Sequence, residues 1–244
     1  MIMIDSSHSV NQEDFKFALK FCENFINQKE IYLDSETGVR VEISQFSDIV
    51  EKIVEFSSDL DFIRTEFNSS KPISYNTNID KALSWVIYNS IPKTRENSQK
   101  HLIFITDGKS DPKVEIKFIK NEADRLKNEF NVKIIAIGIG QSYSQDELSV
   151  IATSPEFIFH VDNFDLLDEI TGTLASQICQ PFYWVLGLPV VVFVLFYVVL
   201  VFLNWYEDRQ LLKDIDDLGN MGSKVLGFVN TVEANAGPDL TSKC

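Results

Sequence analysis

The chain has 244 residues, 45% of them hydrophobic and 24% charged, which is enough for one domain with its own core and a smaller segment beside it. Disorder throughout, a collagen helix and a disulfide-rich miniprotein are excluded, because the composition is globular and the chain has only 3 cysteines. Its 36 acidic residues outnumber 22 basic ones, and the net charge of −14 argues against a nucleic-acid partner while supplying oxygen ligands for hard cations.

The first part of the chain predicts a strand, a helix and a second strand. Residues 1–4 (MIMI) form a short apolar run that predicts a buried strand. Apolar residues from Phe15 to Ile26 recur at the spacing of one helix face, which places Cys22 in the core. Residues 39–47 (VRVEISQFS) alternate between apolar and polar types, as a half-buried strand does. The next expected elements are an edge strand at 53–56 and helices at 60–67 and 81–89.

The next part holds the most apolar strands. Residues 101–106 (HLIFIT) and 132–138 (VKIIAIG) predict buried strands, with a helix at 114–130 between them. The remaining expected elements are a strand at 157–161 and a helix at 165–178. Because continuously apolar strands separated by helices are typical of a parallel sheet covered on both faces, we predict a doubly wound, mostly parallel α/β domain over residues 1–179.

Residues 182–203 (FYWVLGLPVVVFVLFYVVLVFL) are almost wholly apolar. As a helix, about 22 residues rise about 33 Å, which is enough to cross a hydrocarbon core of about 30 Å. Aromatic pairs at 183–184 and 205–206 stand where interfacial belts would lie. A buried core helix is the alternative, but it would need protein on every side because the segment has no polar face. We therefore predict one transmembrane helix at residues 182–204.

Basic residues after the predicted span set its orientation. Arg209, Lys213 and Lys224 follow it, whereas no Lys or Arg lies between Lys133 and the span. By the positive-inside rule, we expect the tail at 205–244, largely disordered, to face the cytoplasm. The N-terminal domain would then lie outside the cell, on a single-pass protein of the plasma membrane.

The chain opens directly on its first apolar run and leaves no room for a signal peptide before Asp5. We expect one of two explanations. Either the sequence is a mature or truncated form, or the span at 182–204 acts as its own signal.

Polar residues follow two of the predicted strands, at the end where open α/β sheets bind their ligands. If the DSSHS loop after the first strand curls, Asp5, Ser7 and Ser9 point toward one place. Asp107 follows the HLIFIT strand and adds a second carboxylate, and Thr77 adds a third hydroxyl from the loop before a helix. Two carboxylates, three hydroxyls and water match the near-octahedral oxygen coordination of Mg²⁺ or Mn²⁺. These five residues are the predicted metal ligands.

With these residues in place, the sequence resembles the von Willebrand factor A domain family, which includes integrin inserted domains, matrilins and collagen VI modules. The resemblance covers residues 1–179, and it is carried by the segments GVRVEISQFSD, TNIDKAL, LIFITDGKSDP and VKIIAIGIG in the family's order. The family's metal-ion-dependent adhesion site uses an Asp-x-Ser-x-Ser loop, a Thr and an Asp. The matching residues are Asp5, Ser7, Ser9, Thr77 and Asp107.

The resemblance implies how such a site would work. Ser7 and Ser9 would bind the metal directly, and Asp5, Thr77 and Asp107 directly or through water. One coordination position would stay open for an acidic side chain of a protein partner. The resemblance also implies that ligand binding moves the C-terminal helix of the domain.

The loops also depart from the family pattern. His8 stands where relatives often carry Gly, and residues 75–78 (YNTN) replace a Gly-rich lead before Thr77. Both changes crowd the loops, so the alternative is a domain that keeps the fold with a weak or empty site. Matrilin-like relatives often carry a disulfide cysteine where Cys179 lies, but no partner cysteine precedes Asp5. Cys179 is therefore free, paired between chains, or without its partner in this sequence.

The resemblance implies a cell-surface adhesion or receptor protein that binds a protein ligand through Mg²⁺. The alternative is a structural subunit of a membrane or extracellular assembly that uses the domain as a packing module, and either function allows an oligomer. A hydrolase would need a base beside the metal-bound water, and the sequence supplies none beyond the ligands themselves. We therefore expect no enzymatic activity.

Overall fold

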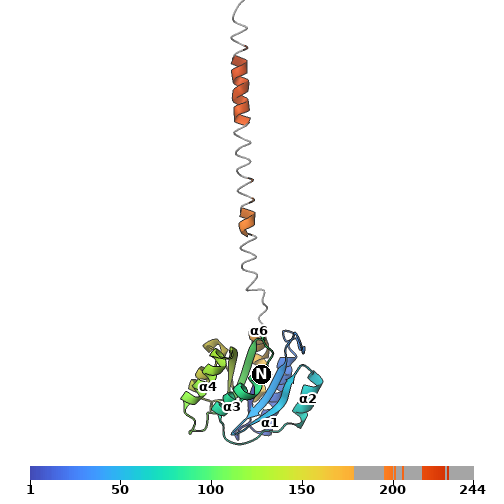
Figure 1. Ribbon diagram of the computed structural model, residues 1–244, viewed down its shortest axis with the longest axis vertical. Helices are drawn as coiled ribbons and strands as arrows, with labels where there is room; N and C mark the ends of the chain where they lie inside the picture. Colours follow the sequence, from blue (N-terminus) through green and yellow to red (C-terminus); the bar gives the residue numbers. More distant parts are fainter. Residues whose placement is uncertain (179–194, 200, 202–204, 206–215, 229, 231–244) are drawn as a thin grey trace, which may run out of the picture. The chain divides into compact units, whose positions relative to one another are not determined.

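The structure is a computed structural model that describes residues 1–178, 195–199, 201, 205, 216–228 and 230 (Figure 1). The chain divides into two compact units, residues 1–180 and 181–244, and each is described by itself.

The first unit is built on a six-stranded sheet in the order β3-β2-β1-β4-β5-β6. All neighbouring strands run parallel except β2 and β3, which are antiparallel. This confirms the predicted mostly parallel α/β fold. The strands are β1 (Ile2–Asp5), β2 (Val41–Phe46), β3 (Val50–Ser57), β4 (Lys100–Thr106), β5 (Val132–Ile139) and β6 (Ile158–Val161).

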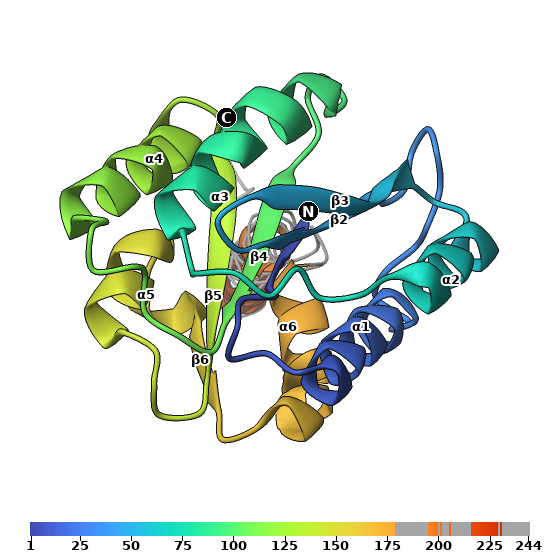
Figure 2. The same ribbon diagram turned by 90° about the horizontal axis from the view of Figure 1, so that it is seen from below.

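Helices cover both faces of the sheet (Figure 2). Helices α1 (Gln12–Ile26), α2 (Leu60–Ser69) and α6 (Thr171–Ile178) pack on one face. Helices α3 (Ile79–Trp85), α4 (Ile116–Asn128) and α5 (Gln145–Ile151) pack on the other. Shorter turns complete the fold: a π-helix at Val86–Ser90 and 3-10 helices at Ile91–Lys93, Pro155–Phe157 and Phe164–Ile170.

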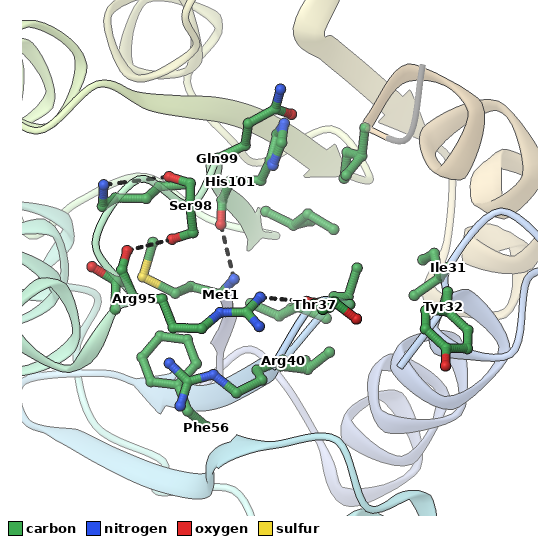
Figure 3. A pocket seen from close by; sticks show the side chains of 18 of the residues that line it. Met1, Ile31, Tyr32, Thr37, Arg40, Phe56, Arg95, Ser98, Gln99 and His101 are labelled. Carbon is green, nitrogen blue, oxygen red and sulfur yellow. Dashed lines mark hydrogen bonds between the residues drawn. The ribbon is translucent and has the colours of Figure 1, made fainter. Parts of the chain in front are cut away.

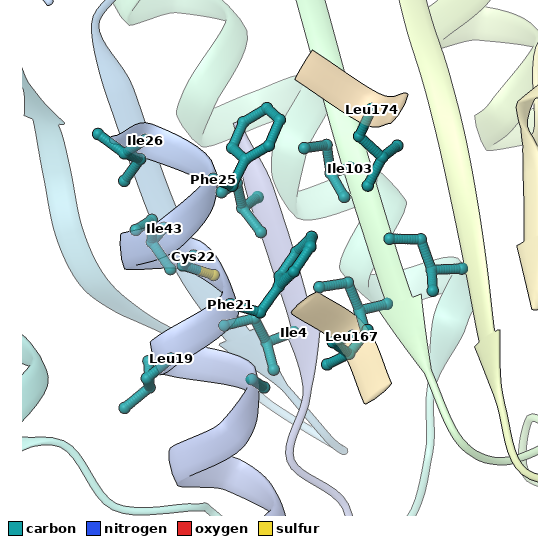
Figure 4. Close-up of a cluster of buried hydrophobic side chains, with 14 of the residues drawn as sticks. Ile4, Leu19, Phe21, Cys22, Phe25, Ile26, Ile43, Ile103, Leu167 and Leu174 are labelled. Carbon is teal, nitrogen blue, oxygen red and sulfur yellow. The ribbon is translucent and has the colours of Figure 1, made fainter. Parts of the chain in front are cut away.

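The core on the α1 face is formed by side chains that the helical spacing predicts. Figure 4 shows this cluster, in which Phe21, Cys22 and Phe25 of α1 lie beside isoleucines of the strands. Each fully buried side chain of this size stabilises the fold by about 1.5–3 kcal/mol. Cys22 is buried, and burial raises the pKa of its thiol far above the ordinary value. It is a core residue, as predicted, and an unreactive one.

Strand β2 corrects the prediction of a half-buried strand, because all six of its residues are buried. It lies between β1 and β3 with helices on both faces, so its polar residues have no access to water. Glu42 is only 2% exposed and accepts a hydrogen bond from the Ser90 hydroxyl, while the Lys52 ammonium lies 3.8 Å from its other oxygen. The alternating pattern therefore marks a buried polar contact and not a solvent-facing side.

Two of the predicted helices each consist of two consecutive segments of different helix type. The one expected at 81–89 is α3 continued by the π-helix, and the one expected at 165–178 is a 3-10 helix continued by α6. The edge strand expected at 53–56 is β3, which is longer and lies at the edge of the sheet as predicted.

The described part of the second unit includes a helix at 216–228 in the tail that the sequence predicts to be largely disordered. Leu218, Met221, Val225 and Phe228 recur at the spacing of one helix face, and all are exposed. Apart from residues 205 and 230, the rest of the tail lies outside the described residues, and its disorder stays a prediction.

The predicted span at 182–204 falls mostly outside the described residues, of which it includes only 195–199 and 201. Within the described parts of the chain, none of the helices has both the length and the apolar character needed to cross a membrane.

Candidate metal site

The carboxyl ends of β1 and β4 lie side by side, because the two strands are parallel neighbours with Ile4 paired to Ile105. Asp5 therefore ends one strand beside Thr106, which ends the other. The loop after β1 stops at Asn11, whose side-chain oxygen accepts the backbone N–H groups of residues 13 and 14 and caps α1. The loop after β1 is thus fixed at one end by strand β1 and at the other by the Asn11 cap of α1.

Backbone hydrogen bonds connect this loop to the segment before α3, and connect that segment in turn to the loop after β4. The His8 N–H donates to the Tyr75 carbonyl at 2.8 Å, and the Ser74 N–H donates to the Ser6 carbonyl at 2.8 Å. The Asp111 N–H donates to the carbonyl of Thr77, also at 2.8 Å. Three segments that are far apart in the sequence therefore form one surface at the carboxyl edge of the sheet.

The predicted ligands converge on this surface. The Ser7 N–H donates to Asp5 Oδ1 at 2.9 Å, and the Ser7 and Ser9 hydroxyl oxygens lie 3.3 Å apart. The Ser9 hydroxyl donates to Asp107 Oδ1 at 2.8 Å. Oxygen atoms from both loops are therefore close enough together to share one cation.

Thr77 lies beside the same cluster, because Gly108 is close to both the Thr77 and the Ser9 hydroxyl. A Cβ placed on Gly108 would lie 3.7 Å from Thr77 Oγ1 and 4.0 Å from Ser9 Oγ. The structure thus brings all five predicted residues to one place, while their role as metal ligands stays a prediction.

Thr106 is a positioning residue that the sequence analysis missed. Its hydroxyl donates to Asp5 Oδ2 at 2.6 Å and accepts the N–H of Gly108 at 3.3 Å. It therefore orients one carboxylate and connects it to the loop that carries the other. The sequence signal that could have identified Thr106 is a hydroxyl residue at the end of a buried strand, directly before Asp107.

The electrostatics of the two carboxylates fit a divalent cation. Burial, and after it the negative charge of Asp107, raises the pKa of Asp5 to about 6. Burial also raises the pKa of Asp107 above its ordinary value. A bound cation with two positive charges would reverse both effects, because it balances the two carboxylates.

The donor set is all oxygen, which suits Mg²⁺ or Mn²⁺. The residues present fit such an ion, with water completing the coordination. In the described parts of the chain, no group of three or more His, Cys, Asp and Glu residues could hold a metal ion. The candidate site differs from such groups because hydroxyls supply three of its five side chains.

A hollow of about 240 Å³ adjoins the candidate ligands. His8 and Tyr75, by which the loops depart from the family pattern, lie at its rim with exposed side chains. The hollow gives a partner group access to the cation position from solvent. It is lined by Ser7, His8, Ser9, Tyr75, Asn76, Thr77, Lys109, Ser110, Asp111 and Pro112.

A larger cavity of about 550 Å³ lies at the amino edge of the sheet (Figure 3). Its two arginines donate hydrogen bonds to backbone carbonyls of the protein itself. The Arg95 guanidinium donates to the carbonyls of Ser35, at 3.2 Å, and Gly38. Arg40 donates to the Lys93 carbonyl at 3.2 Å. None of the five predicted ligands lines this cavity, so it is separate from the candidate metal site.

A family model described as von Willebrand factor type A domain matches residues 1–173. The chain belongs to this family. Human collagen alpha-6(VI) chain is 32% identical over 187 residues, which cover 74% of this chain and 8% of the collagen chain. Vitrin from Bos taurus is 30% identical over 186 residues, which cover 74% of this chain and 27% of vitrin. This von Willebrand factor A chain therefore spans only a small part of these relatives.

Solved structures of other proteins share the fold. Proximal thread matrix protein 1 from the mussel byssus, with zinc occupying its MIDAS motif, gives a TM-score of 0.64 at 24% identity over 73% of this chain and 44% of that one. The manganese-loaded TRAP protein of Plasmodium vivax gives 0.54 at 19% identity over 69% of this chain and 70% of that one. These likenesses confirm the predicted fold of the von Willebrand factor A domain, and both neighbours carry divalent metals.

Proposed function

We propose that this von Willebrand factor A domain binds a protein ligand through Mg²⁺ or Mn²⁺ held by Asp5, Ser7, Ser9, Thr77 and Asp107. The observation that carries the proposal is the chain of contacts at 2.8–3.3 Å that links Ser7, Ser9 and Asp107 at the carboxyl edge of the sheet. When bound, the cation would supply a positive centre that accepts a carboxylate oxygen. The metals of the two structural neighbours, zinc and manganese, support a divalent ion here.

The protein's own residues would do the positioning. Thr106 holds Asp5 by a hydrogen bond of 2.6 Å, and Asp5 in turn accepts the backbone N–H of Ser7 at 2.9 Å. The hollow outside the hydroxyls leaves room for an acidic side chain of the ligand. Because a hard cation prefers carboxylate oxygen, we infer that the ligand presents Asp or Glu.

We further propose that the protein is not an enzyme. Among residues 1–178, which the structure describes, no Ser or Cys side chain is hydrogen-bonded to a His ring that could activate it. The hydroxyls of Ser7 and Ser9 contact each other instead, and that of Ser9 donates to Asp107. This arrangement suits cation binding and lacks an activated nucleophile.

The location that we propose is the plasma membrane, with the span at 182–204, the domain outside the cell and the tail in the cytoplasm. Support comes from the apolar length of residues 182–203 and from the basic residues that follow them. A membrane-impermeant biotin reagent on intact cells is expected to label lysines of residues 1–178 and not Lys213 or Lys224. Labelling of the tail alone, or of neither part, would contradict this topology.

A second candidate function is a packing module in an extracellular assembly, in an oligomer or with other subunits. The similarity to a collagen chain and to a thread matrix protein favours it. In that case contacts would lie away from the metal edge, and the cation would serve only to stabilise the loops.

Binding of the cation tests the proposed function first. In the full chain, purified with detergent, Asp107→Ala is expected to weaken Mg²⁺ binding more than about 100-fold, because a ligand is lost where even an outer partner contributes about 10–100-fold. Isothermal titration calorimetry measures the affinity. Asp61→Ala, which removes a carboxylate that is 94% exposed on α2, is the matched control and should leave it unchanged.

Ligand capture then separates the two candidate functions. Partners pulled down by the full chain in Mg²⁺ and lost in EDTA or with Asp107→Ala support the metal-bridged function. Binding that persists in chelator, with a footprint far from Ser7, Ser9 and Thr77, would refute that function and favour the packing module.

A further inference from the structure

We propose that the hollow beside the candidate metal site is a second subsite, in which Lys109 and Ser110 bind another acidic group of the same ligand. This inference rests on the proposed function and makes it more specific. The ligand segment would carry two acidic residues close together, one directed to the cation and one to the hollow.

The hollow is continuous with the candidate metal site. Ser7, Ser9 and Thr77 form one of its walls, so a group bound in it lies next to the cation position. Lys109, Ser110 and the two residues after them also line it. A short peptide segment is therefore long enough to reach both places.

The walls of the hollow are held in place before any ligand arrives. The Asn76 amide donates to Asp111 Oδ2 at 3.1 Å, and the Asp111 N–H donates to the Thr77 carbonyl at 2.8 Å. The His8 N–H bonds to the Tyr75 carbonyl on the other side. Binding in a preformed hollow loses less conformational entropy than binding that must order loops.

Ser110 has an unused donor at this place. The residue is 8% exposed, and its hydroxyl oxygen is buried without a hydrogen-bond partner among the described residues. Its backbone N–H is already bonded, to Glu147 Oε2 at 3.3 Å. A buried polar group without a partner is unfavourable, so an acceptor from a ligand would satisfy the hydroxyl.

Lys109 brings a positive charge to the hollow. It is exposed, and its side chain forms no ion pair or hydrogen bond within 4 Å with any residue that the structure describes. The acidic side chains near it accept hydrogen bonds from uncharged donors, Asp111 from Asn76 and the Lys113 N–H and Glu147 from the Ser110 N–H, and the charge of Lys109 acts on Glu147 only at longer range. By contrast, Lys117 on α4 is paired with Glu115 at 2.7 Å.

Two further residues that line the hollow suit the methylene groups of an acidic side chain. Tyr75, which is 57% exposed, and Pro112 also line the hollow. Both offer apolar surface to methylene groups, while Lys109 and Ser110 offer donors to the carboxylate. The net charge of −14 repels anions from most of the chain, so the Lys109 ammonium and the Ser110 hydroxyl beside the cation position are the local groups that would attract an acidic one.

Synthetic peptides test the proposal. The probes are fluorescent glycine-based peptides with one Glu, or with two Glu residues separated by zero to three glycines. Fluorescence polarisation measures their binding to the full chain in Mg²⁺ and in EDTA. At least one peptide with two Glu residues is expected to bind about ten-fold more tightly than the peptide with one, which corresponds to about 1.4 kcal/mol.

Matched variants locate the second group. Lys109→Gln and Ser110→Ala are each expected to remove most of the ten-fold gain and to leave binding of the one-Glu peptide unchanged. Lys113→Gln makes the same change of charge on the same loop, but Lys113 does not line the hollow, so the gain should remain. Thermal unfolding of each variant checks that the fold is kept.

The outcomes separate this inference from the proposed function. Equal binding of all peptides in Mg²⁺, with loss in EDTA, would overturn the second subsite and leave the metal-bridged function standing. Loss of the gain in Lys113→Gln as large as in Lys109→Gln would also overturn the subsite, because the attraction would then be diffuse. Binding of no peptide, or binding that EDTA does not affect, would overturn both.

Discussion

The carboxyl edge and the amino edge of the sheet are both hollowed, but their polar groups differ in what they have left to bind. At the amino edge, the cavity is larger, about 550 Å³ against about 240 Å³, yet Arg95 and Arg40 donate to backbone carbonyls of the protein itself. At the carboxyl edge, Asp107 raises the pKa of the nearby Asp5 carboxyl, and the Ser110 hydroxyl has no hydrogen-bond partner among the described residues. This unused hydrogen-bonding capacity, and not the volume of a cavity, is why we propose that the ligand binds at the carboxyl edge.

The largest effect that we predict in this comparison is an acid sensitivity at the amino edge. Burial, followed by the positive charges of the N-terminus and Lys133, lowers the pKa of His101 to about 4. The unfolded chain takes up this proton near pH 6.5, so it binds more protons than the folded chain as the pH falls. Stability from His101 is therefore complete above about pH 6.5 and is lost as the pH falls toward about 4.

Urea unfolding at several pH values measures this effect. Between about pH 6.5 and about pH 4, the unfolding free energy of the chain should fall on the order of 3 kcal/mol more than that of His101→Gln. Both proteins should bind Mg²⁺ alike at neutral pH, because His101 lies at the other edge. Identical pH profiles would show that His101 is protonated equally in both states.

The next largest effect is a difference in stability between alanine substitutions at two glycines, one at each edge of the sheet. A Cβ on Gly38, in the amino-edge loop, would lie 2.7 Å from Asp34 Cβ and 2.8 Å from its backbone nitrogen, which is a clash. A Cβ on Gly108 would make only ordinary contacts, at 3.7 Å and beyond. We expect Gly38→Ala to destabilise the fold by about 1–3 kcal/mol, and Gly108→Ala to change stability by less than about 0.5 kcal/mol.

Thermal unfolding compares the two variants, and calorimetry gives their Mg²⁺ affinity. Gly108→Ala should weaken Mg²⁺ binding slightly, because the new methyl stands beside Thr77 and Ser9, whereas Gly38→Ala should leave it unchanged. The reverse pattern, with Gly38→Ala losing the metal and keeping its stability, would break the distinction between the two edges.

The smallest predicted effect comes from a change in the orientation of Asp5, one of the predicted metal ligands. Thr106→Val removes the hydroxyl that donates to Asp5 Oδ2 and keeps a side chain of similar shape. We expect about a ten-fold loss of Mg²⁺ affinity, since outer partners of metal ligands contribute about 10–100-fold. Thr106→Ser, which keeps the hydroxyl, should restore most of it. No change in Thr106→Val would mean that Asp5 is held by its other contacts alone.

Much of the fold could be predicted because local patterns report burial. The helix spacing from Phe15 to Ile26 placed Cys22 in the core, and the structure confirms this. The alternation in β2 misled the prediction, because burial there depends on neighbours in the sheet that a local pattern does not contain.

The sequence by itself determined the parallel α/β fold, the family, and the set Asp5, Ser7, Ser9, Thr77 and Asp107 as candidates for one site. It could do so because strand ends and the alternate spacing of residues 5, 7 and 9 are local properties. Only the tertiary structure decided that these oxygens meet, that Thr106 orients Asp5, and that the Ser110 hydroxyl is buried beside them without a hydrogen-bond partner among the described residues. The physical reason is that hydrogen-bond partners and burial arise between segments far apart in the chain, which come together only when the sheet forms.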